Sequence, residues 1–235
     1  MREEVSQFIQ RADLPFEKDD VLETALTHSS WAYEHAPERR ADNERLEFLG
    51  DAVLQLSVST ALFSLSPSMA EGRMSKMRSL LVCEETLARL ARKLDLGAVL
   101  LLGHGEEITG GREKDSNLAN AMEAVMGALY LEKGFDVASS WVLRELQPYL
   151  ELVLQGQLRY DYKSALLEFA QTLSTRPQVH FEIVSEEGPV HDRIFTTEVK
   201  FDERPLGRGS GRSKKEAEQK ASRFVLEQLS GTRES

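Results

Sequence analysis

The chain has 235 residues, of which 41% are hydrophobic and 29% are charged, and its formal net charge is −10. This length allows one large domain or two small ones, and the composition is ordinary for a globular protein. No run approaches the roughly 20 apolar residues of a membrane span, and the first residues do not form a basic-then-apolar signal region, so we expect no membrane partner. Cys83 is the only cysteine, which excludes an intrachain disulfide and favours a reducing, cytoplasmic location.

The negative charge is unevenly distributed along the chain. Residues 157–235 hold 13 Lys and Arg against 13 Asp and Glu, whereas residues 1–156 hold 16 against 26. The first part would repel a nucleic-acid backbone unless cations bind it. The neutral second part can bind such a backbone through a local basic cluster.

From residue 5 to about residue 151, apolar residues recur with the period of a helix, interrupted near Pro15, Pro37, residues 66–68 and residues 103–111. No alternating strand pattern of useful length appears, so this part is predicted to be all-α. The glycines of residues 103–111 invite a phosphate-loop interpretation, but no strand precedes them and their spacing is not that of a P-loop. We expect a flexible connector there.

The most informative helix begins at residues 43–51. Glu44, Glu47 and Asp51 fall on one helical face, while apolar residues between them turn toward a core. Like charges at this spacing cost a helix roughly 0.2–0.5 kcal/mol per pair, and no basic residue lies one turn away. An oxygen-preferring divalent cation would compensate for the repulsion; a merely solvated acidic face is the alternative.

A second helix, predicted over residues 118–131, carries Asn120 and Glu123 three residues apart within a strong apolar stripe. A Glu in so apolar a helix is rarely buried without a partner. Small residues in the same stretch permit close approach of another helix. Two helices that each offer oxygen ligands from one face fit a Mg²⁺ site inside a helical bundle.

The pattern changes around residues 154–160, where we place a linker. An amphipathic helix is predicted over residues 162–173, strands over 179–185, 194–200 and 204–209, and a last helix over 214–229. Ser213 and Glu216 form a capping box at the start of the last helix. Lys214 and Lys215 lie in its first turn, where acidic residues are normally favoured, which indicates a shared phosphate ligand; ordinary solvated lysines are the alternative.

Three segments together resemble the bacterial ribonuclease III family, and they occur in the family's order. They are Ala25-Leu26-Thr27-His28-Ser29-Ser30, Asn43-Glu44-Arg45-Leu46-Glu47-Phe48-Leu49-Gly50-Asp51-Ala52 and Asn117-Leu118-Ala119-Asn120-Ala121-Met122-Glu123-Ala124. The helix, three strands and helix of the last part look like a double-stranded RNA-binding domain. The resemblance therefore covers nearly the whole chain.

This resemblance implies a two-domain protein. An all-α ribonuclease III endonuclease and dimerisation domain is expected over residues 1–153, a linker over 154–160 and an α+β (αβββα) double-stranded RNA-binding domain over 161–230. The implied activity is hydrolysis of phosphodiester bonds in double-stranded RNA by a homodimer with Mg²⁺, which Mn²⁺ can replace, leaving 5′-phosphate and 3′-hydroxyl ends. The expected substrates are rRNA precursors and other structured transcripts, not small molecules.

The resemblance also implies roles for the acidic residues of the two helices. Glu47, Asn120 and Glu123 match the family's metal ligands, and Asp51 and Glu123 match its catalytic carboxylates, with Asp51 orienting the attacking water. Many relatives carry Asp where Asn120 stands. An amide oxygen still coordinates Mg²⁺, but it brings no negative charge, so the expected affinity is lower.

Three further positions match the family in the same way. Glu44 and Glu71 correspond to acidic residues at the edge of the cleavage cleft, where they would position RNA. Phe48 corresponds to a residue that packs into the partner subunit at the dimer interface; an ordinary core Phe is the alternative.

Contacts with RNA are expected from the C-terminal part. His191 matches a loop that enters the minor groove, although an ordinary surface His is the alternative, and Leu167 stands where some relatives carry a polar groove-reading residue, which weakens the expectation for the first helix. The expected RNA-binding residues are Glu168, Gln171, His191, Arg212, Lys214 and Lys215.

Two rival interpretations remain open at the level of the sequence. One is a non-catalytic double-stranded RNA-binding protein with a disabled nuclease fold, for which Asn120 is the support. The other is an unrelated metal-binding helical protein fused to an RNA-binding module, but this does not explain the motif around Thr27, His28 and Ser29.

Overall fold

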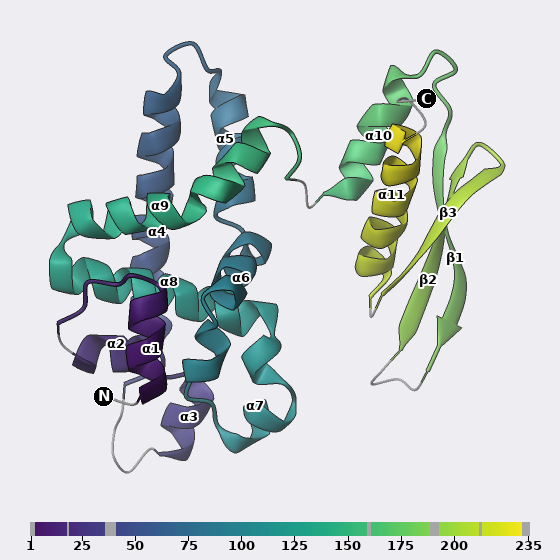
Figure 1. The fold of residues 1–235 in the computed structure, drawn as a ribbon. Coiled ribbons are helices and arrows are strands. Elements are labelled where there is room, and N and C mark those ends of the chain that lie inside the picture. Colours follow the sequence, from purple (N-terminus) through teal and green to yellow (C-terminus); the bar gives the residue numbers. More distant parts are fainter. Residues whose placement is uncertain are drawn as a thin grey trace. The chain divides into compact units, whose positions relative to one another are not determined.

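The computed structural model describes residues 3–17, 19–35, 41–158, 161–188, 193–211 and 213–231. The chain divides into two compact units, Met1–Leu158 and Arg159–Ser235 (Figure 1). This division falls within residues 154–160, where the linker was predicted. Helix α9 continues through Leu154, one residue into that stretch.

The described part of the first unit is helical, as its periodicity predicts. Its longer helices are α4 (Glu44–Leu65), α8 (Asp115–Lys133) and α9 (Phe135–Leu154), which pack against one another. The remaining elements are α1 (Glu3–Arg11), α2 (Asp19–Ala25), α3 (Ser29–Glu34), α5 (Glu71–Leu81), α6 (Glu84–Lys93), η2 (Leu96–Val99), α7 (His104–Ile108) and η3 (Gly111–Glu113).

Helices α4 and α8 touch through their backbones, because each has a glycine at the crossing. A Cβ atom added to Gly50 would lie 1.8 Å from the backbone oxygen of Glu123. One added to Gly127 would lie 2.3 Å from the backbone oxygen of Leu46. Any side chain at either position therefore forces the helices apart. The crossing fixes Asp51, next to Gly50, against Glu123, one turn before Gly127.

The apolar stripe of α8 forms the centre of the first unit. Its members Leu118, Met122, Val125, Met126 and Leu129 are all almost fully buried, as predicted. Helix α4 is long and apolar enough to cross a membrane by length and composition alone, which the sequence analysis did not anticipate. Its packing against α8 and α9 buries a third of that apolar window, and one such helix is weak evidence for a membrane span, since core helices of globular domains have a similar composition.

The glycine-containing stretch at residues 103–111 is more ordered than the predicted flexible connector. It contains α7 and the start of η3. Arg112 fixes it to the preceding segment by donating to the carbonyl oxygens of Gly97, at 2.8 Å, and Leu100, at 2.9 Å. Asn117 donates to Glu106 at 2.8 Å and to the carbonyl oxygen of Gly111 at 3.0 Å. These long-range bonds leave no local sequence signal, which is why the periodicity missed them.

The second unit has the predicted order of a helix, three strands and a helix. These are α10 (Tyr162–Thr172), β1 (Val179–Glu187), β2 (Ile194–Phe201), β3 (Arg204–Gly211) and α11 (Lys214–Gly231). The strands form an antiparallel sheet in the order β1-β2-β3, with irregularities between Ile183 and Ser185 and between Val199 and Lys200. Each strand extends one or two residues beyond its predicted end.

The two helices of this unit pack together and α11 lies on the sheet, with a small apolar core between the layers (Figure 1). Leu166, Val199, Ala221 and Val225 form the buried centre. Helix α11 approaches β3 so closely that a Cβ atom at Gly209 would lie 2.1 Å from the backbone nitrogen of Ala221. The glycine in β3 is therefore required by the packing of the helix on the strand.

Candidate functional site

The residues predicted on the two acidic helices meet in one pocket of about 530 Å³. Helix α4 contributes Glu44, Glu47, Phe48 and Asp51, and α8 contributes Asn120 and Glu123; His28, Ser29 and Asn43 complete the lining. The glycine crossing explains this convergence, because it holds the two helices in backbone contact beside the carboxylates. No Lys or Arg is among the described residues that line the pocket.

Crowding of negative charge is the main electrostatic property of this pocket. Burial, followed by the charges of Asp51 and Glu47, raises the pKa of Glu123 to about 8. Burial, followed by the charges of Glu44 and Asp51, also raises the pKa of Glu47. Asp51 accepts a hydrogen bond from Gln55 at 3.2 Å, whereas no described residue donates one to the carboxylates of Glu47 or Glu123 in this structure. Two carboxylates therefore have free oxygen acceptors in an acidic pocket.

Such acceptors suit a hard cation that retains much of its own water. Among the described residues, no three His, Cys, Asp or Glu side chains lie close enough together to hold a metal ion by themselves. The pocket is thus an open set of oxygen groups, not a closed cage. Mg²⁺ is usually held through one or two carboxylates together with water and substrate phosphates, so the residues present fit this ion. Asn120 is exposed and can add a neutral amide oxygen.

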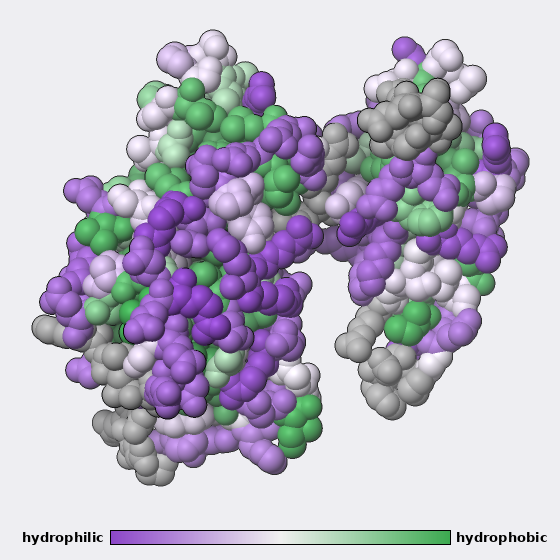
Figure 2. Space-filling model, in the orientation of Figure 1, coloured by the Kyte–Doolittle hydropathy of each residue, from purple (hydrophilic) through white to green (hydrophobic). Residues whose placement is uncertain are grey.

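Phe48 lies at the mouth of the pocket with 82% of its surface exposed. It is therefore not the core residue that was the alternative in the sequence analysis. Further along α4, Leu56 and Phe63 are 54% and 74% exposed, so this helix presents large apolar side chains along a surface of the first unit. Figure 2 shows hydrophobic surface over the ends of α4 and α5.

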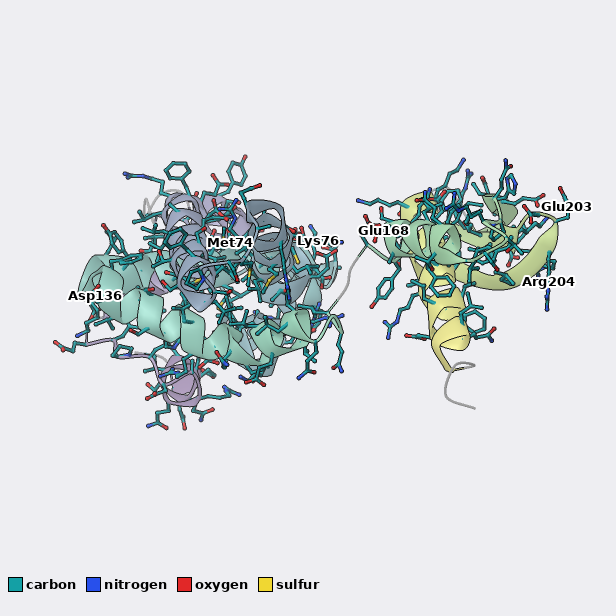
Figure 3. The ribbon with its side chains drawn as sticks, turned by 90° about the horizontal axis from the view of Figure 1, so that it is seen from above. Met74, Lys76, Asp136, Glu168, Glu203 and Arg204 are labelled. Atoms are coloured by element: carbon teal, nitrogen blue, oxygen red, sulfur yellow. The ribbon has the colours of Figure 1, made fainter. Side chains whose placement is uncertain are left out.

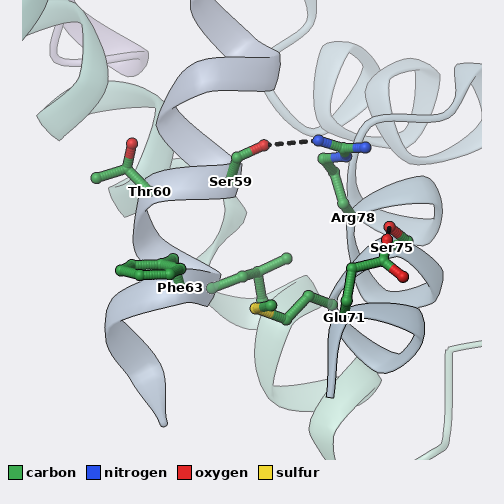
Figure 4. Close-up of a pocket in the computed structure, with 8 residues that line it drawn as sticks. Ser59, Thr60, Phe63, Glu71, Ser75 and Arg78 are labelled. Atoms are coloured by element: carbon green, nitrogen blue, oxygen red, sulfur yellow. Dashed lines mark hydrogen bonds between the residues drawn. The ribbon is translucent and has the colours of Figure 1, made fainter. Parts of the chain in front are cut away.

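Glu71 does not line the pocket that holds Glu47. It begins α5 and lines a second pocket of about 430 Å³ between α4 and α5, together with Ser59, Phe63 and Arg78 (Figure 4). Within this pocket Arg78 donates to Ser59 at 2.9 Å, and Ser75 donates to Glu71 at 2.7 Å. Because α4 rises about 1.5 Å per residue, its length separates the two pockets. Within one chain Glu71 therefore does not lie beside Glu47, and its role at the edge of the cleavage cleft stays a prediction.

Sequence reasoning did not assign a role to His28, Ser29 or Asn43, although all three line the pocket. His28 and Ser29 belong to the first of the three motifs, and Asn43 begins the second. The presence of these three residues in the motifs was the one sequence feature that could have indicated their place in the pocket. Their position beside α4 depends on backbone contacts between segments that are distant in the chain, which the motifs alone do not reveal.

In the second unit, the basic residues at the start of α11 are exposed. Lys214 has a side-chain exposure of 60%, lies 3.9 Å from Glu186 and stands 5.8 Å from the ring centroid of Phe195. Lys215 is also exposed. Ser213 accepts a hydrogen bond from the backbone nitrogen of Glu216 at 3.1 Å, which confirms that Ser213 caps this helix. Both lysines are thus exposed at a helix N-terminus, where an anion can bind, with Lys214 in a long ion pair with Glu186.

The other predicted RNA contacts divide into two groups. Glu168 and Gln171 are exposed on α10, and Glu168 is labelled in Figure 3. Leu167 beside them is 38% exposed, so an apolar side chain does interrupt this surface. His191 and Arg212 lie outside the described residues.

Family comparisons cover both units. A ribonuclease-III-like family model matches residues 18–150. A double-stranded RNA binding motif matches residues 162–229. The first match includes all the residues that line the acidic pocket, and the second includes α10, the sheet and most of α11.

Curated relatives and solved structures agree with these models. A ribonuclease 3 of Pelotomaculum thermopropionicum is 45% identical over 92% of this chain and 89% of its own length. A ribonuclease 3 of Shouchella clausii is 44% identical over 96% of this chain and 86% of its own. A crystal structure of the nuclease domain of a ribonuclease III from Campylobacter jejuni aligns with a TM-score of 0.58 at 40% identity, over 63% of this chain and 97% of that one.

Proposed function

Because the chain belongs to the ribonuclease III family of double-stranded RNA endoribonucleases, we propose that it hydrolyses phosphodiester bonds as a homodimer with Mg²⁺. The products would carry 5′-phosphate and 3′-hydroxyl ends. The observation that carries the proposal is the convergence of Glu47, Asp51, Asn120 and Glu123 on one pocket, in a chain whose second unit contains a double-stranded RNA binding motif.

The residues of the pocket would divide the work between ion binding and water orientation. Glu47, Asn120 and Glu123 would hold Mg²⁺, or Mn²⁺ in its place, since they offer oxygen atoms from two helices. The ion would polarise the scissile phosphate and stabilise the leaving 3′ oxygen. Asp51 has one carboxylate oxygen engaged by Gln55, and its other oxygen would orient the attacking water. Glu44, exposed at the pocket's edge, would help position the RNA strand.

The second unit would supply most of the affinity for RNA. Lys214 and Lys215 are exposed at the start of α11, where ammonium groups and helix N–H groups can share one phosphate. These separate roles of the two units would explain why negative charge is concentrated in the first part of the chain. An acidic catalytic unit that repels RNA without metal is delivered to the duplex by a separate neutral unit with a basic cluster.

Dimerisation is supported by the exposed face of α4. Phe48, Leu56 and Phe63 together present more apolar surface than isolated exposed residues do. A solved nuclease domain of a Campylobacter jejuni ribonuclease III, 41% identical to this chain with a TM-score of 0.57, is described as flexible in a region involved in dimer formation. A second copy against α4 would cover Phe48 and place two acidic pockets along one duplex.

The substrates that fit this arrangement are structured transcripts, including rRNA precursors, because long base-paired segments arise when such RNAs fold on themselves. Processing of these transcripts would place the enzyme in the cytoplasm, and the absence of disulfide-forming cysteine pairs agrees with that location. The open, acidic pocket is suited to a phosphate backbone bridged by cations, not to a small molecule.

One gel tests the proposal. The pure protein is incubated with a long RNA duplex, with and without Mg²⁺ or Mn²⁺, beside a DNA duplex of the same sequence. We expect cleavage of the RNA duplex alone, and only with metal. RNA binding without cleavage at any metal concentration would favour the rival non-catalytic function, for which the neutral Asn120 is the supporting observation. Elution of the protein as a monomer in size-exclusion chromatography would contradict the homodimer.

A further inference from the structure

His28 is the one imidazole among the described residues that line the acidic pocket. It is also the N-cap of α3, with an extended backbone at φ −74° and ψ 149°. A residue that only caps a short helix has no reason to line a pocket of carboxylates. His28 therefore has two roles to account for, the cap of α3 and the lining of the pocket.

The backbone on either side of His28 is held firmly against α4. The backbone nitrogen of His28 donates to the carbonyl oxygen of Leu101 at 3.0 Å. The carbonyl oxygen of Thr27 accepts from the backbone nitrogen of Asn43 at 2.9 Å. Asn43 in turn accepts from Glu47 at 2.8 Å through its carbonyl oxygen, in the first turn of α4. This chain of bonds fixes His28 opposite the helix that carries Glu47 and Asp51.

The hydrogen bonds of Nδ1 determine which ring nitrogen carries the proton. The backbone N–H of Ser30 donates to Nδ1 at 3.2 Å, so Nδ1 must present a lone pair. The hydroxyl of Ser30 lies 2.8 Å from Nδ1. That same oxygen accepts from the backbone N–H of Gly103 at 2.9 Å, which leaves its proton to point at Nδ1. A neutral imidazole with this acceptor role carries its proton on Nε2.

The Nε2–H group has no hydrogen-bond partner in the described part of the chain. Glu106 lies within electrostatic range of the His28 ring, although its pKa is lowered mainly by the hydrogen bond from Asn117. No hydrogen bond joins His28 to this carboxylate among the described residues. The donor is therefore available for a further ligand, and His28 lines the pocket that such a ligand would enter.

We propose that His28, through Nε2–H, binds a non-bridging phosphate oxygen of the RNA strand being cut, and so holds that strand against the carboxylates of α4 and α8. The inference rests on the proposed function. A phosphate is the fitting acceptor because its oxygens are charged, which makes the hydrogen bond strong. It is also the RNA group that the surrounding carboxylates repel, so a fixed donor beside them has the greatest effect there. The protonated Nε2 has no lone pair, which excludes His28 as a metal ligand in this tautomer.

Two substitutions separate the capping role of His28 from its proposed binding of phosphate. His28→Gln places an amide N–H near the position of Nε2, and His28→Asn places a side-chain oxygen where the cap of α3 needs an acceptor, since Asn is a good N-cap. The full-length variants are compared in cleavage of a long RNA duplex at saturating Mg²⁺, in the Mg²⁺ concentration for half-maximal rate and in thermal melting. His28→Ala serves as the reference that loses both the N–H donor and the side-chain cap of α3.

We expect His28→Asn and His28→Ala to lower kcat/KM about 10- to 100-fold, the range expected for loss of a hydrogen bond to a charged group. His28→Gln should stay within about threefold of the parent protein, even if its melting temperature falls through loss of the cap. Retained activity in His28→Asn with loss in His28→Gln would reduce His28 to a helix cap and overturn the inference. Equal activities of the two variants, whether high or low, would overturn it as well.

The metal titration separates this inference from the proposed function. If His28 binds phosphate, His28→Asn should need a Mg²⁺ concentration for half-maximal rate within about twofold of the parent protein's. A tenfold increase in that concentration would make the residue a metal ligand and refute the inference. Cleavage by the parent protein with Mg²⁺ tests the proposed function by itself. A second variant, Ser30→Ala, removes the hydroxyl that fixes the ring and should lower kcat/KM in the same assay while leaving the ring present; no change would contradict the tautomer argument.

Discussion

Glu123→Gln should abolish cleavage and, in the absence of metal, make the protein more stable. The carboxyl of Glu123 has a pKa of about 8 in the folded chain, against an ordinary value of 4.5, because it is partly buried next to Asp51 and Glu47. The folded state thus holds the proton more tightly than the unfolded state. Stability due to this proton is complete below about pH 4.5 and is lost as the pH rises toward 8.

The magnitude follows from the shift in pKa. A shift of that size corresponds to about 5 kcal/mol at 1.36 kcal/mol per unit, and partial exposure of the group to solvent reduces this to about 2 kcal/mol. For a domain of this size, 2 kcal/mol corresponds to a rise of about 4–8 °C in Tm. The neutral amide of Gln mimics the protonated acid, so the two proteins should melt alike near pH 4.5, and the variant should be the more stable one at pH 8.

Thermal melting from pH 5 to pH 9 in the presence of a chelator measures the effect. Glu23→Gln makes the same chemical change at an exposed position of α2, and we expect it to alter stability by less than about 0.5 kcal/mol at every pH. Adding Mg²⁺ should raise the Tm of the parent protein more than that of Glu123→Gln. A stability difference that stays constant across the pH range, or a variant that is less stable at pH 8, would refute the reasoning.

Three other substitutions test separate parts of the structure. Replacing Lys214 and Lys215 with Ala should weaken binding to all RNA duplexes alike, because phosphate contacts carry no sequence information. The slope of the logarithm of the binding constant against the logarithm of the salt concentration should fall by about 2. A loss of affinity confined to some sequences in a filter-binding assay would contradict this. Asn120→Asp should lower the Mg²⁺ concentration for half-maximal cleavage by up to about tenfold, since one added charge at a partly screened site contributes on the order of 1 kcal/mol. An unchanged metal dependence would mean that this residue does not face the ion. Gly127→Ala should lower the free energy of unfolding by more than about 3 kcal/mol, because its Cβ atom would lie 2.3 Å from a backbone oxygen. Gly105→Ala should be tolerated, because a Cβ atom there has nothing within 4 Å. Equal denaturation midpoints for the two variants would show that α4 and α8 separate at little cost in free energy.

Properties that depend on near neighbours in the chain could be predicted from the sequence. The stripe of α8 repeats with the helical period, and its members are buried as that period requires. Ser213 caps α11 because the capping box spans only one helical turn. The grouping of Glu47 with Glu123 was also within reach, because both helices offered oxygen ligands from one face and the second had small residues that allow close contact.

The features that could not be predicted depend on contacts between distant segments. The order of residues 103–111 comes from bonds made by Arg112 and Asn117 to backbone oxygen atoms and to Glu106, and no local pattern specifies such partners. The position of Glu71 depends on where α5 packs along α4, so the motif match could not show that it lines a different pocket from Glu47 within one chain. The direction of the His28 ring depends on Ser30 and Gly103 together.

The glycine crossing has a consequence for the order in which the protein assembles and comes apart. Gly50 and Gly127 are far apart in the chain, so the loop between them must close before their helices meet, and the entropy lost in closing it slows folding. No partly folded chain in which α8 is detached can contain the paired carboxylates. Conversely, local opening at this crossing has to break the centre of the first unit, which is the most protected kind of region in hydrogen exchange. The proposed catalytic pocket therefore exists only after α8 has docked on α4.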